Sequence, residues 1–242
     1  MMPLISVVTP VHISTQDQLF YLEQLIKSFL KQRYRDKELI VSDDLSDFRV
    51  KELCNRFNAS GATVRYVKSP TSGISCNLNY AISHAKGKFV KILFQDDFFS
   101  NTFALTLIWM RLAITKKHWH VSASIHFNQS TSQFVRKFKP RISNALLDGK
   151  NYISSPSVVT FKATAQLDFC ENLDYLMDCE WYLRMSHRFG LPVFGKLILI
   201  ANRLHVDQAT HWAKERLKIE SIIAKRIHDQ TEMNSRKCKC RC

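Results

Sequence analysis

The alternation of short strands and longer helices in the first hundred residues is the feature that most restricts the fold of this chain. Short runs rich in Val, Ile and Leu alternate there with segments whose apolar residues recur every three or four positions, the period of an amphipathic helix. Strands are expected at 4–9, 38–42, 63–67 and 89–94, and helices at 16–32, 48–57 and 73–85. Repeated βα units of this length predict a single-domain α/β fold of Rossmann type, with a mostly parallel sheet flanked by helices.

Two adjacent carboxylates, Asp96 and Asp97, follow the fourth expected strand. The carboxyl ends of parallel strands form the edge at which open α/β sheets bind ligands. Two acids on one turn repel each other, and a cation stabilises both as carboxylates. Mg²⁺ and Mn²⁺ prefer carboxylate oxygen and leave coordination positions for phosphate. The pair therefore indicates a divalent-cation site that carries a diphosphate, with a solvated turn as the simpler alternative.

Further candidates for ligand contact stand at the ends of the first and second expected strands. Thr9, Pro10 and Val11 end the first strand, and Asp43 and Asp44 end the second. In a parallel sheet these residues come to the same edge as the acidic pair. Carboxylates at that edge suit the N–H and hydroxyl groups of a base and a ribose. We therefore expect these five residues to contact a nucleotide.

The helix after the third strand is expected to meet the phosphates of that nucleotide. Ser72 and Gly73 open this helix. The first N–H groups of a helix attract anions. Ser75 and Asn79, in its first two turns, are predicted to bind the nucleotide together with Asp96.

The net charge of +14, from 35 basic and 21 acidic residues, suits a polyanionic ligand, an anionic membrane or nucleic acid. A basic patch is formed by Arg136, Lys137, Lys139 and Arg141. No zinc-finger spacing, RNP-like strand or helix-turn-helix signature accompanies the charge, so we expect no nucleic-acid partner.

The chain has no apolar run of the ~18 residues that a membrane-spanning helix needs. Its first residues lack the basic region and cleavage site of a signal peptide, so we expect a cytoplasmic protein. A basic amphipathic helix is predicted at 212–228. Docking of this helix on the core is the favoured interpretation, and peripheral contact with the inner face of an anionic membrane is the alternative.

Four segments resemble the family 2 glycosyltransferases, which have the GT-A fold. They read ISVVTP at 5–10, ELIVSDDLSD at 38–47, GISCNLN at 73–79 and GKFVKILFQDD at 87–97. The resemblance covers residues 4–212. It departs from the family pattern at Leu78, where an Arg is usual, and at Gln95, where the first acid of a D-x-D motif is usual.

The resemblance implies a nucleotide-sugar donor and a divalent cation, Mn²⁺ or Mg²⁺. Asp97 corresponds to the main metal-binding acid of the family. His205, followed by Gln208 and Thr210, is similar to the flexible segment that closes over the diphosphate, where an imidazole can bind the metal or the phosphate. Asp97 and His205 are therefore the expected metal ligands.

The resemblance also implies a carboxylate base that takes a proton from the acceptor hydroxyl. Glu180, directly before Trp181, aligns best with this base, and Asp178 is the second candidate. Cys179 stands where a companion acid is usual. Both acids also lie where the dipole of a helix favours negative charge, which is the alternative explanation for them.

The expected function is inverting transfer of a sugar to a hydroxyl of a glycan, lipid-linked or other acceptor. Residues 1–212 would form the GT-A domain, with a nucleotide-binding half at 1–100 and an acceptor half at 101–212. Residues 213–242 would form a C-terminal basic helix and a disordered Cys-rich tail. Acceptor specificity is expected in the irregular stretch at 128–152.

Two other classes of function stay open from the sequence. Leu78 and Gln95 favour a catalytically silent nucleotide-sugar-binding protein of the same fold. The charge alone favours a nucleic-acid-binding accessory protein.

Overall fold

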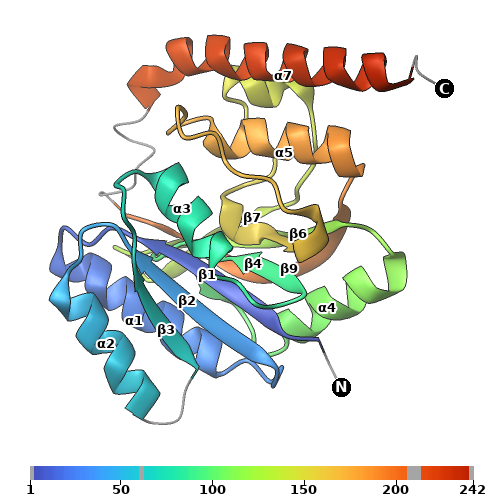
Figure 1. The fold of residues 1–242 in the computed structure, drawn as a ribbon. Coiled ribbons are helices and arrows are strands. Elements are labelled where there is room, and N and C mark those ends of the chain that lie inside the picture. The colour runs from blue at the N-terminus through green and yellow to red at the C-terminus, as the bar shows by residue number, and fades with distance from the viewer. Residues whose placement is uncertain (1–2, 60–62, 206–213, 240–242) are drawn as a thin grey trace.

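The computed structural model describes residues 3–59, 63–205 and 214–239 of the chain. The strands are β1 (Ile5–Val11), β2 (Lys37–Asp43), β3 (Val64–Lys68), β4 (Phe89–Ile92), β5 (Phe98–Phe99), β6 (Trp119–Asn128), β7 (Gln133–Phe138), β8 (Val159–Lys162) and β9 (Val193–Leu204). The helices are α1 (Gln16–Leu30), α2 (Phe48–Ala59), α3 (Ile74–Ser83), α4 (Ala104–Thr115), α5 (Met177–Phe189) and α7 (Leu217–Lys239) (Figure 1).

The first four strands form the parallel half of the sheet, in the order β3-β2-β1-β4. β1 is buried along its whole length, and β2 is buried after its first residue. The centre of each strand is apolar, at 7–8 in β1 and 39–41 in β2, as in strands covered on both faces. The carboxyl ends of β1, β2 and β4 reach the same edge of the sheet, as predicted.

The second half of the chain extends the sheet with antiparallel strands. β8 pairs antiparallel with β4 and with β6, while β9 runs parallel to β6. The predicted α/β fold is confirmed, and its sheet is mixed beyond β4. The stretch at 128–152, which we expected to be irregular, contains β7 and the 3₁₀ turn η1 (Asn144–Asp148). β7 pairs antiparallel with the end of β6.

Local signals in the sequence explain where α1 begins. Thr15 is the N-cap, and its side chain accepts a hydrogen bond from the backbone N–H of Gln18. The Gln18 side chain accepts one from the backbone N–H of Thr15 in return. This capping box satisfies donors at the helix start and so fixes the turn that follows β1.

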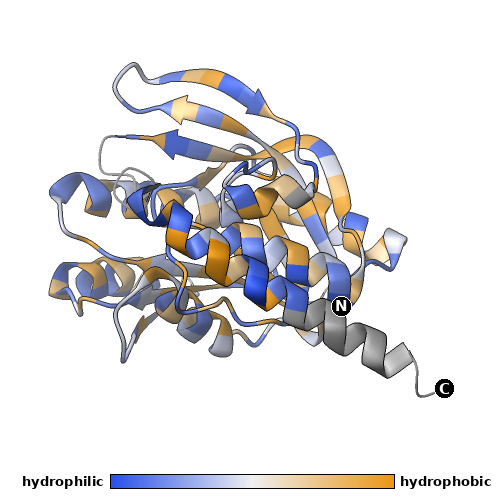
Figure 2. Cartoon of the chain, turned by 90° about the horizontal axis from the view of Figure 1, so that it is seen from above, coloured by the Kyte–Doolittle hydropathy of each residue, from blue (hydrophilic) through white to orange (hydrophobic). Residues whose placement is uncertain are grey.

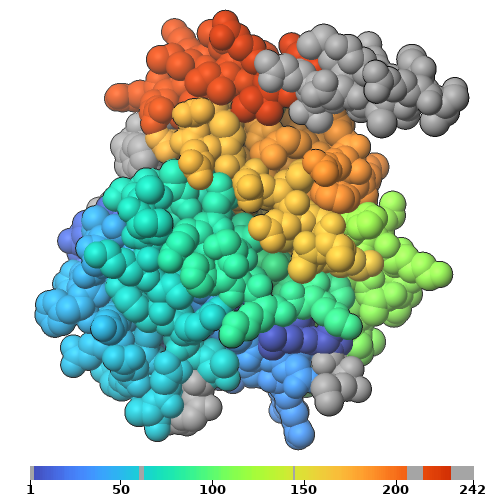
Figure 3. Space-filling model, viewed as in Figure 1, coloured from blue at the N-terminus to red at the C-terminus, as the bar shows by residue number. Residues whose placement is uncertain are grey.

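The helices α5 and α7 are stacked at one end of the molecule, away from α1 and α2 (Figure 1). Figure 3 shows α7 as an outer layer at that end. The helix continues to Lys239, beyond the predicted end at residue 228, so the expectation of a disordered tail is wrong for residues up to 239. The helices of the described residues include none that is long and apolar enough to cross a bilayer.

Candidate active site

A cavity of about 420 Å³ lies where the loop after β4, the end of β9 and the start of α5 meet. Its polar lining comes from segments far apart in the sequence. The polar residues that the following argument uses are Asp96, Asp97, Asn151, Ser155, Asp178 and Asn202. The structure therefore brings the predicted acidic pair and one of the two candidate bases into a single cavity.

Asp97 is held by three hydrogen bonds at the bottom of the loop after β4. Its side chain accepts bonds from the backbone N–H of Arg203 at 3.0 Å, Ser155 Oγ at 3.0 Å and Asn202 Nδ2 at 2.8 Å. Burial, and then the charge of Asp96, raises the pKa of Asp97 to about 7. Both carboxylate oxygens are thus occupied by the protein, and Asp97 is only 3% exposed.

Asp96 is more accessible and faces an imidazole. Its Oδ2 atom lies 3.0 Å from His205 Nε2, and the side chain of Asp96 is 22% exposed. Arg203 fixes the loop by donating from Nε to the backbone oxygen of Asp96 at 2.9 Å. Within the described residues no group of three or more His, Cys, Asp or Glu side chains surrounds a common point. Asp96 and His205 therefore offer a two-ligand set, which suits an ion that a diphosphate also coordinates.

Asp178 lines the same cavity from the first turn of α5. Asn151 Nδ2 donates to Asp178 Oδ2 at 2.8 Å, and the backbone N–H of Cys179 donates to Oδ1 at 2.6 Å. Burial raises the pKa of Asp178 to about 6. The side chain is thus a carboxylate near neutral pH whose orientation is fixed and whose proton affinity is increased, as a general base requires.

A chain of hydrogen bonds joins Asp97 to Asp178. Asn202, which donates to Asp97, accepts a bond from Ser154 Oγ at 3.0 Å. Asn151 Oδ1 accepts from the backbone N–H of Ser154 at 3.0 Å. Ser154 has a φ of 89°, a conformation that L-residues rarely adopt and that persists where the surroundings enforce it. The network therefore fixes the relative position of two walls of the cavity.

Glu180, the sequence's first candidate for the base, has a different environment. It is 2% exposed and forms a bidentate pair with Arg184, with distances of 2.6 and 2.7 Å. Arg184 also donates to the backbone oxygen of Asp168 at 2.8 Å. Glu180 is absent from the cavity lining, and its pairing with Arg184 fixes α5 to the preceding loop.

Asp44 directly follows the carboxyl end of β2. One of its oxygens is 2.9 Å from His12 Nδ1, and the other accepts a bond from the backbone N–H of Gly73 at 3.2 Å. Gln95 clamps the backbone of His12 from both sides, accepting from its N–H at 2.7 Å and donating to its carbonyl at 3.0 Å. The departure at Gln95 thus has a structural role: it ties the end of β1 to the loop that carries the acidic pair.

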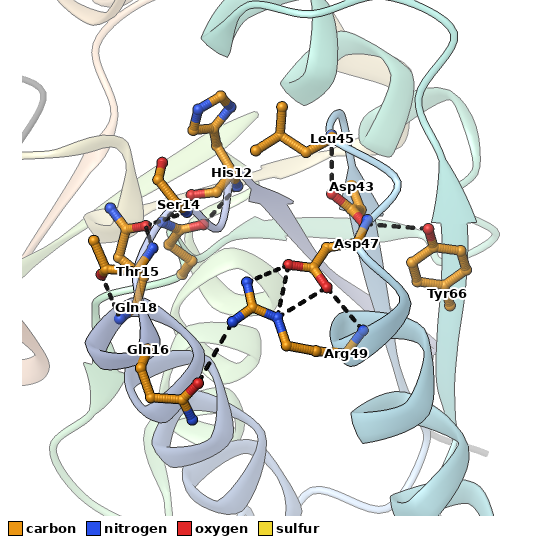
Figure 4. Close-up of polar contacts among 11 residues, drawn as sticks. His12, Ser14, Thr15, Gln16, Gln18, Asp43, Leu45, Asp47, Arg49 and Tyr66 are labelled. Atoms are coloured by element: carbon orange, nitrogen blue, oxygen red, sulfur yellow. Dashed lines mark hydrogen bonds and ion pairs between the residues drawn. The ribbon is translucent and has the colours of Figure 1, made fainter.

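The carboxylate of Asp43 accepts hydrogen bonds from the loop that directly follows it. Its carboxylate accepts bonds from the backbone N–H groups of Leu45 at 3.0 Å and Asp47 at 2.7 Å, and from Tyr66 Oη at 3.2 Å. Figure 4 shows these contacts beside the exposed ring of His12. Asp43 is fully buried, which raises its pKa. The two acids therefore have different roles. Asp43 stabilises the conformation of the loop, and Asp44 faces the N-terminus of α3 at Gly73.

The other expected nucleotide contacts are mostly buried. Thr9, Pro10 and Val11 lie inside β1. Ser75 Oγ donates to the backbone oxygen of residue 173 at 3.0 Å, and Asn79 binds the backbone of residue 169 through both ends of its amide. These side chains attach the strand and α3 to their surroundings and do not line the cavity. Leu78, which stands where the family pattern usually has an Arg, is fully buried in the core.

Sequence reasoning missed four polar residues of the site: Asn151, Ser154, Ser155 and Asn202. Asn202 carries a detectable signal, because it interrupts an apolar strand and is 6% exposed. The other three lie in or beside the stretch at 128–152, where the periodicity of the sequence predicts no element. The segment at 206–210, which includes Gln208 and Thr210 of the expected closing segment, lies outside the described residues.

Comparison with known proteins places these features in a family. Residues 6–187 match the model of glycosyl transferase family 2. An uncharacterized glycosyltransferase of Rickettsia bellii is 24% identical over 86% of this chain and 31% of its own length. One of Rickettsia typhi is 26% identical over 89% of this chain and 69% of its own length. One of Haemophilus influenzae is 35% identical over 41% of this chain and 39% of its own length. The chain thus spans less than half the length of two of these relatives.

Two solved structures share the GT-A fold of this chain. A mannosyltransferase of Pyrobaculum calidifontis, in complex with GDP-Man and Mn²⁺, superposes with a TM-score of 0.70 over 94% of this chain and 65% of its own, at 15% identity. The S. aureus protein TarS (residues 1–349), in complex with UDP, superposes with a TM-score of 0.67 over 90% of this chain and 65% of its own, at 16% identity.

Proposed function

Because this chain belongs to glycosyl transferase family 2, we propose that it transfers a sugar from a nucleotide diphosphate donor to a hydroxyl group of an acceptor. One observation carries the proposal. A single cavity is lined by Asp96, from the loop after β4, and by Asp178, from the first turn of α5. A carboxylate suited to the cation and diphosphate thus lines the same cavity as a carboxylate suited to proton transfer.

The donor would lie along the carboxyl edge of the parallel strands. Asp44 and the exposed ring of His12 would contact the nucleoside, and the N-terminus of α3 at Gly73 lies beside them. The diphosphate would lie between this helix start and Asp96. Holding the donor in one orientation lowers the entropic part of the barrier to reaction.

A divalent cation would be held by Asp96 and His205. The carboxylate and the imidazole fit Mn²⁺ in donor type, and a nucleotide diphosphate supplies further oxygens. The Mn²⁺ bound with GDP-Man in the Pyrobaculum enzyme supports this choice of ion. When bound, the ion would neutralise charge on the leaving diphosphate. Asp97 would support the loop from below, since its oxygens already accept three hydrogen bonds.

Asp178 would act as the base. Its carboxylate accepts the proton of the acceptor hydroxyl while that oxygen bonds to the anomeric carbon and the bond from that carbon to the diphosphate breaks. A single displacement of this kind inverts the anomeric configuration. Asn151 would keep the receiving oxygen of Asp178 directed into the cavity. We assign the base to Asp178 and not to Glu180, because Asp178 lines the cavity, whereas Glu180 does not line it and is ion-paired with Arg184.

The helix α7 supports a peripheral contact with an anionic membrane. Ile219 and Ile222 are 66% and 56% exposed, beside the exposed Lys218 and Arg226. Figure 2 shows hydrophobic and hydrophilic residues side by side along this helix. Apolar and basic groups together favour an anionic bilayer surface.

We expect the wild-type protein to sediment with anionic vesicles and the double variant Ile219→Ser, Ile222→Ser to remain in the supernatant, because the variant lacks the exposed apolar side chains. Equal sedimentation of both proteins would contradict the membrane contact.

The proposed activity is tested first by ligand-induced stabilisation. A panel of nucleotide sugars, with UDP- and GDP-linked members, is added to the protein with Mn²⁺ or with EDTA, and the melting temperature is measured. A ligand at 100 times its Kd adds ~2.7 kcal/mol to the stability of the folded state. We expect at least one nucleotide sugar to raise the melting temperature with Mn²⁺ only. A panel without any stabilising member would refute the proposal.

A further inference from the structure

Basic side chains without acidic partners lie in the segment that contributes Phe138, Gly149 and Asn151 to the cavity lining. Between residues 133 and 152 the basic residues are Arg136, Lys137, Lys139, Arg141 and Lys150. The only acid of this stretch, Asp148, lies 2.7 Å from Lys225 of α7. All five basic side chains are exposed, and none of them forms an ion pair with a described residue. This stretch therefore holds positive charge that the described chain does not neutralise.

The guanidinium groups of two of these side chains lie over aromatic rings. The guanidinium of Arg136 lies 5.5 Å from the centre of the Phe138 ring, and that of Arg141 lies 4.3 Å from the centre of the Tyr152 ring. A guanidinium stacked on a ring keeps its N–H edge free to bind an oxyanion with two hydrogen bonds. We call Arg136, Phe138, Arg141 and Tyr152 the arginine strip.

The arginine strip adjoins the cavity through Phe138, the one member of the strip that lines it. Phe138 lines the cavity together with His126, and their rings stack at 5.9 Å. Arg136 is the cross-strand partner of His126, so the two side chains share a face of the β6–β7 hairpin. Tyr152 directly follows Asn151, which donates to Asp178. A molecule that reached Asp178 through this side of the cavity would therefore pass the two arginines.

We propose that the arginine strip binds the phosphate of a lipid-linked acceptor, so that the acceptor's sugar hydroxyl enters the cavity beside Asp178. This inference rests on the proposed transferase function and adds the chemical class of the acceptor. The arginines match an oxyanion in charge and in geometry. The proposal makes Arg136 and Arg141 specificity residues, which bind the acceptor without taking part in the chemical step.

The apolar residues of β7 indicate a lipid rather than a free polyanion. Phe134 and Val135 are 56% and 52% exposed on the strand that carries Arg136. Phe134 pairs with Phe127 and so lies on the face of the hairpin opposite that of Arg136, and within the described residues β7 pairs with no strand other than β6. An amphiphile at this free edge can place its chain on Phe134 and its phosphate on Arg136. A soluble acidic polymer would leave Phe134 and Val135 facing water.

The test uses the full chain and farnesyl diphosphate, a short lipid diphosphate, as probe. Binding is measured by calorimetry in EDTA, so that a metal-dependent donor site does not take up the diphosphate. The test variant is Arg136→Gln, Arg141→Gln. The matched control is Lys51→Gln, Lys117→Gln, which removes the same charge from two exposed residues elsewhere. Donor binding by each protein is measured separately from its Mn²⁺-dependent stabilisation by the nucleotide sugar.

We expect the wild type and the control to bind farnesyl diphosphate, and the arginine variant to bind it at least about tenfold more weakly, because two charge-assisted contacts are lost. All three should keep their stabilisation by the donor. Equal binding of the probe by all three proteins would overturn the proposal. Wild-type binding of inorganic diphosphate as tight as that of farnesyl diphosphate would overturn the assignment to a lipid. A wild type that no nucleotide sugar stabilises would instead refute the proposed function itself.

Discussion

Replacing Asp178 by Asn should lower the turnover of the donor by ~10²- to 10⁴-fold, the usual contribution of a positioned base. Asn has the same shape and keeps the hydrogen bond from Asn151 through its oxygen, but its N–H₂ group then faces the backbone N–H of Cys179, which lowers stability. Asn cannot take a proton near neutral pH. Because the base acts only in the transition state, kcat should fall while donor affinity is unchanged. The measurement is the rate of nucleoside diphosphate release from the donor that stabilises the protein.

Glu180→Gln is the matched control, since Glu180 is the second acid of the same helix turn. Gln preserves the contact with Arg184 in part, so this variant should lose stability and keep most of its turnover at temperatures where it is folded. If Glu180→Gln were inactive and Asp178→Asn active, the base would be Glu180 as the sequence pattern favoured.

The pH dependence of turnover follows from the environment of Asp178. Burial raises its pKa to about 6, above the ordinary value for Asp. Since the base acts as a carboxylate, turnover should be fully present above this pKa and should be lost as the pH falls through about 6. Asp178→Asn should remove this acid limb from its residual rate, and Glu180→Gln should keep it.

The fold was predictable because its N-terminal half follows local rules. Each βα unit shows its period in the sequence, and Thr15 and Gln18 mark the start of α1. β5 and β7 are different: β5 has two residues, and the side chains of β7 are mostly exposed, so neither produces an apolar run. β5 pairs with β9, which lies about 100 residues later in the chain, and β7 pairs with β6 across an irregular register. The periodicity of the sequence detects neither pairing.

The kinds of functional group in the candidate site could be predicted from the sequence, but the role of each individual residue could not. The acidic pair was found because ligands bind at the carboxyl ends of strands in α/β folds, and the acids of α5 were found from the family resemblance around Trp181. Which acid is available to a ligand depends on partners that the periodicity of the sequence does not reveal. Arg184, one turn further along α5, pairs with Glu180, and Asn202 and the backbone N–H of Arg203, more than 100 residues along the chain, bind Asp97. Gln95, a departure from the family pattern, has its role only through the backbone of His12, 83 residues earlier.

Replacing Asp96 by Ala should abolish the Mn²⁺ dependence of donor binding. Asp96 is the accessible member of the acidic pair, and its loss leaves His205 as the only described side chain of the two-ligand set. A diphosphate needs the ion to screen its charge beside the remaining carboxylate of Asp97. Donor affinity with Mn²⁺ should therefore fall at least about tenfold, a range typical for damaged metal sites.

Asp97→Asn is the control that separates the two acids. Asn at this position would direct an amide N–H₂ at donors that now bind a carboxylate, and an unsatisfied buried partner costs about 1–3 kcal/mol. This variant should unfold at lower denaturant concentration while its donor binding stays dependent on Mn²⁺. The opposite pattern would return the metal-binding role to Asp97.

Calorimetric titration of the wild type and Asp96→Ala with the nucleotide sugar, with Mn²⁺ and with EDTA, tests the central assignment of this cavity. We expect binding by the wild type with Mn²⁺, much weaker binding with EDTA, and equally weak binding by Asp96→Ala under both conditions. Tight binding by Asp96→Ala that still requires Mn²⁺ would contradict the assignment.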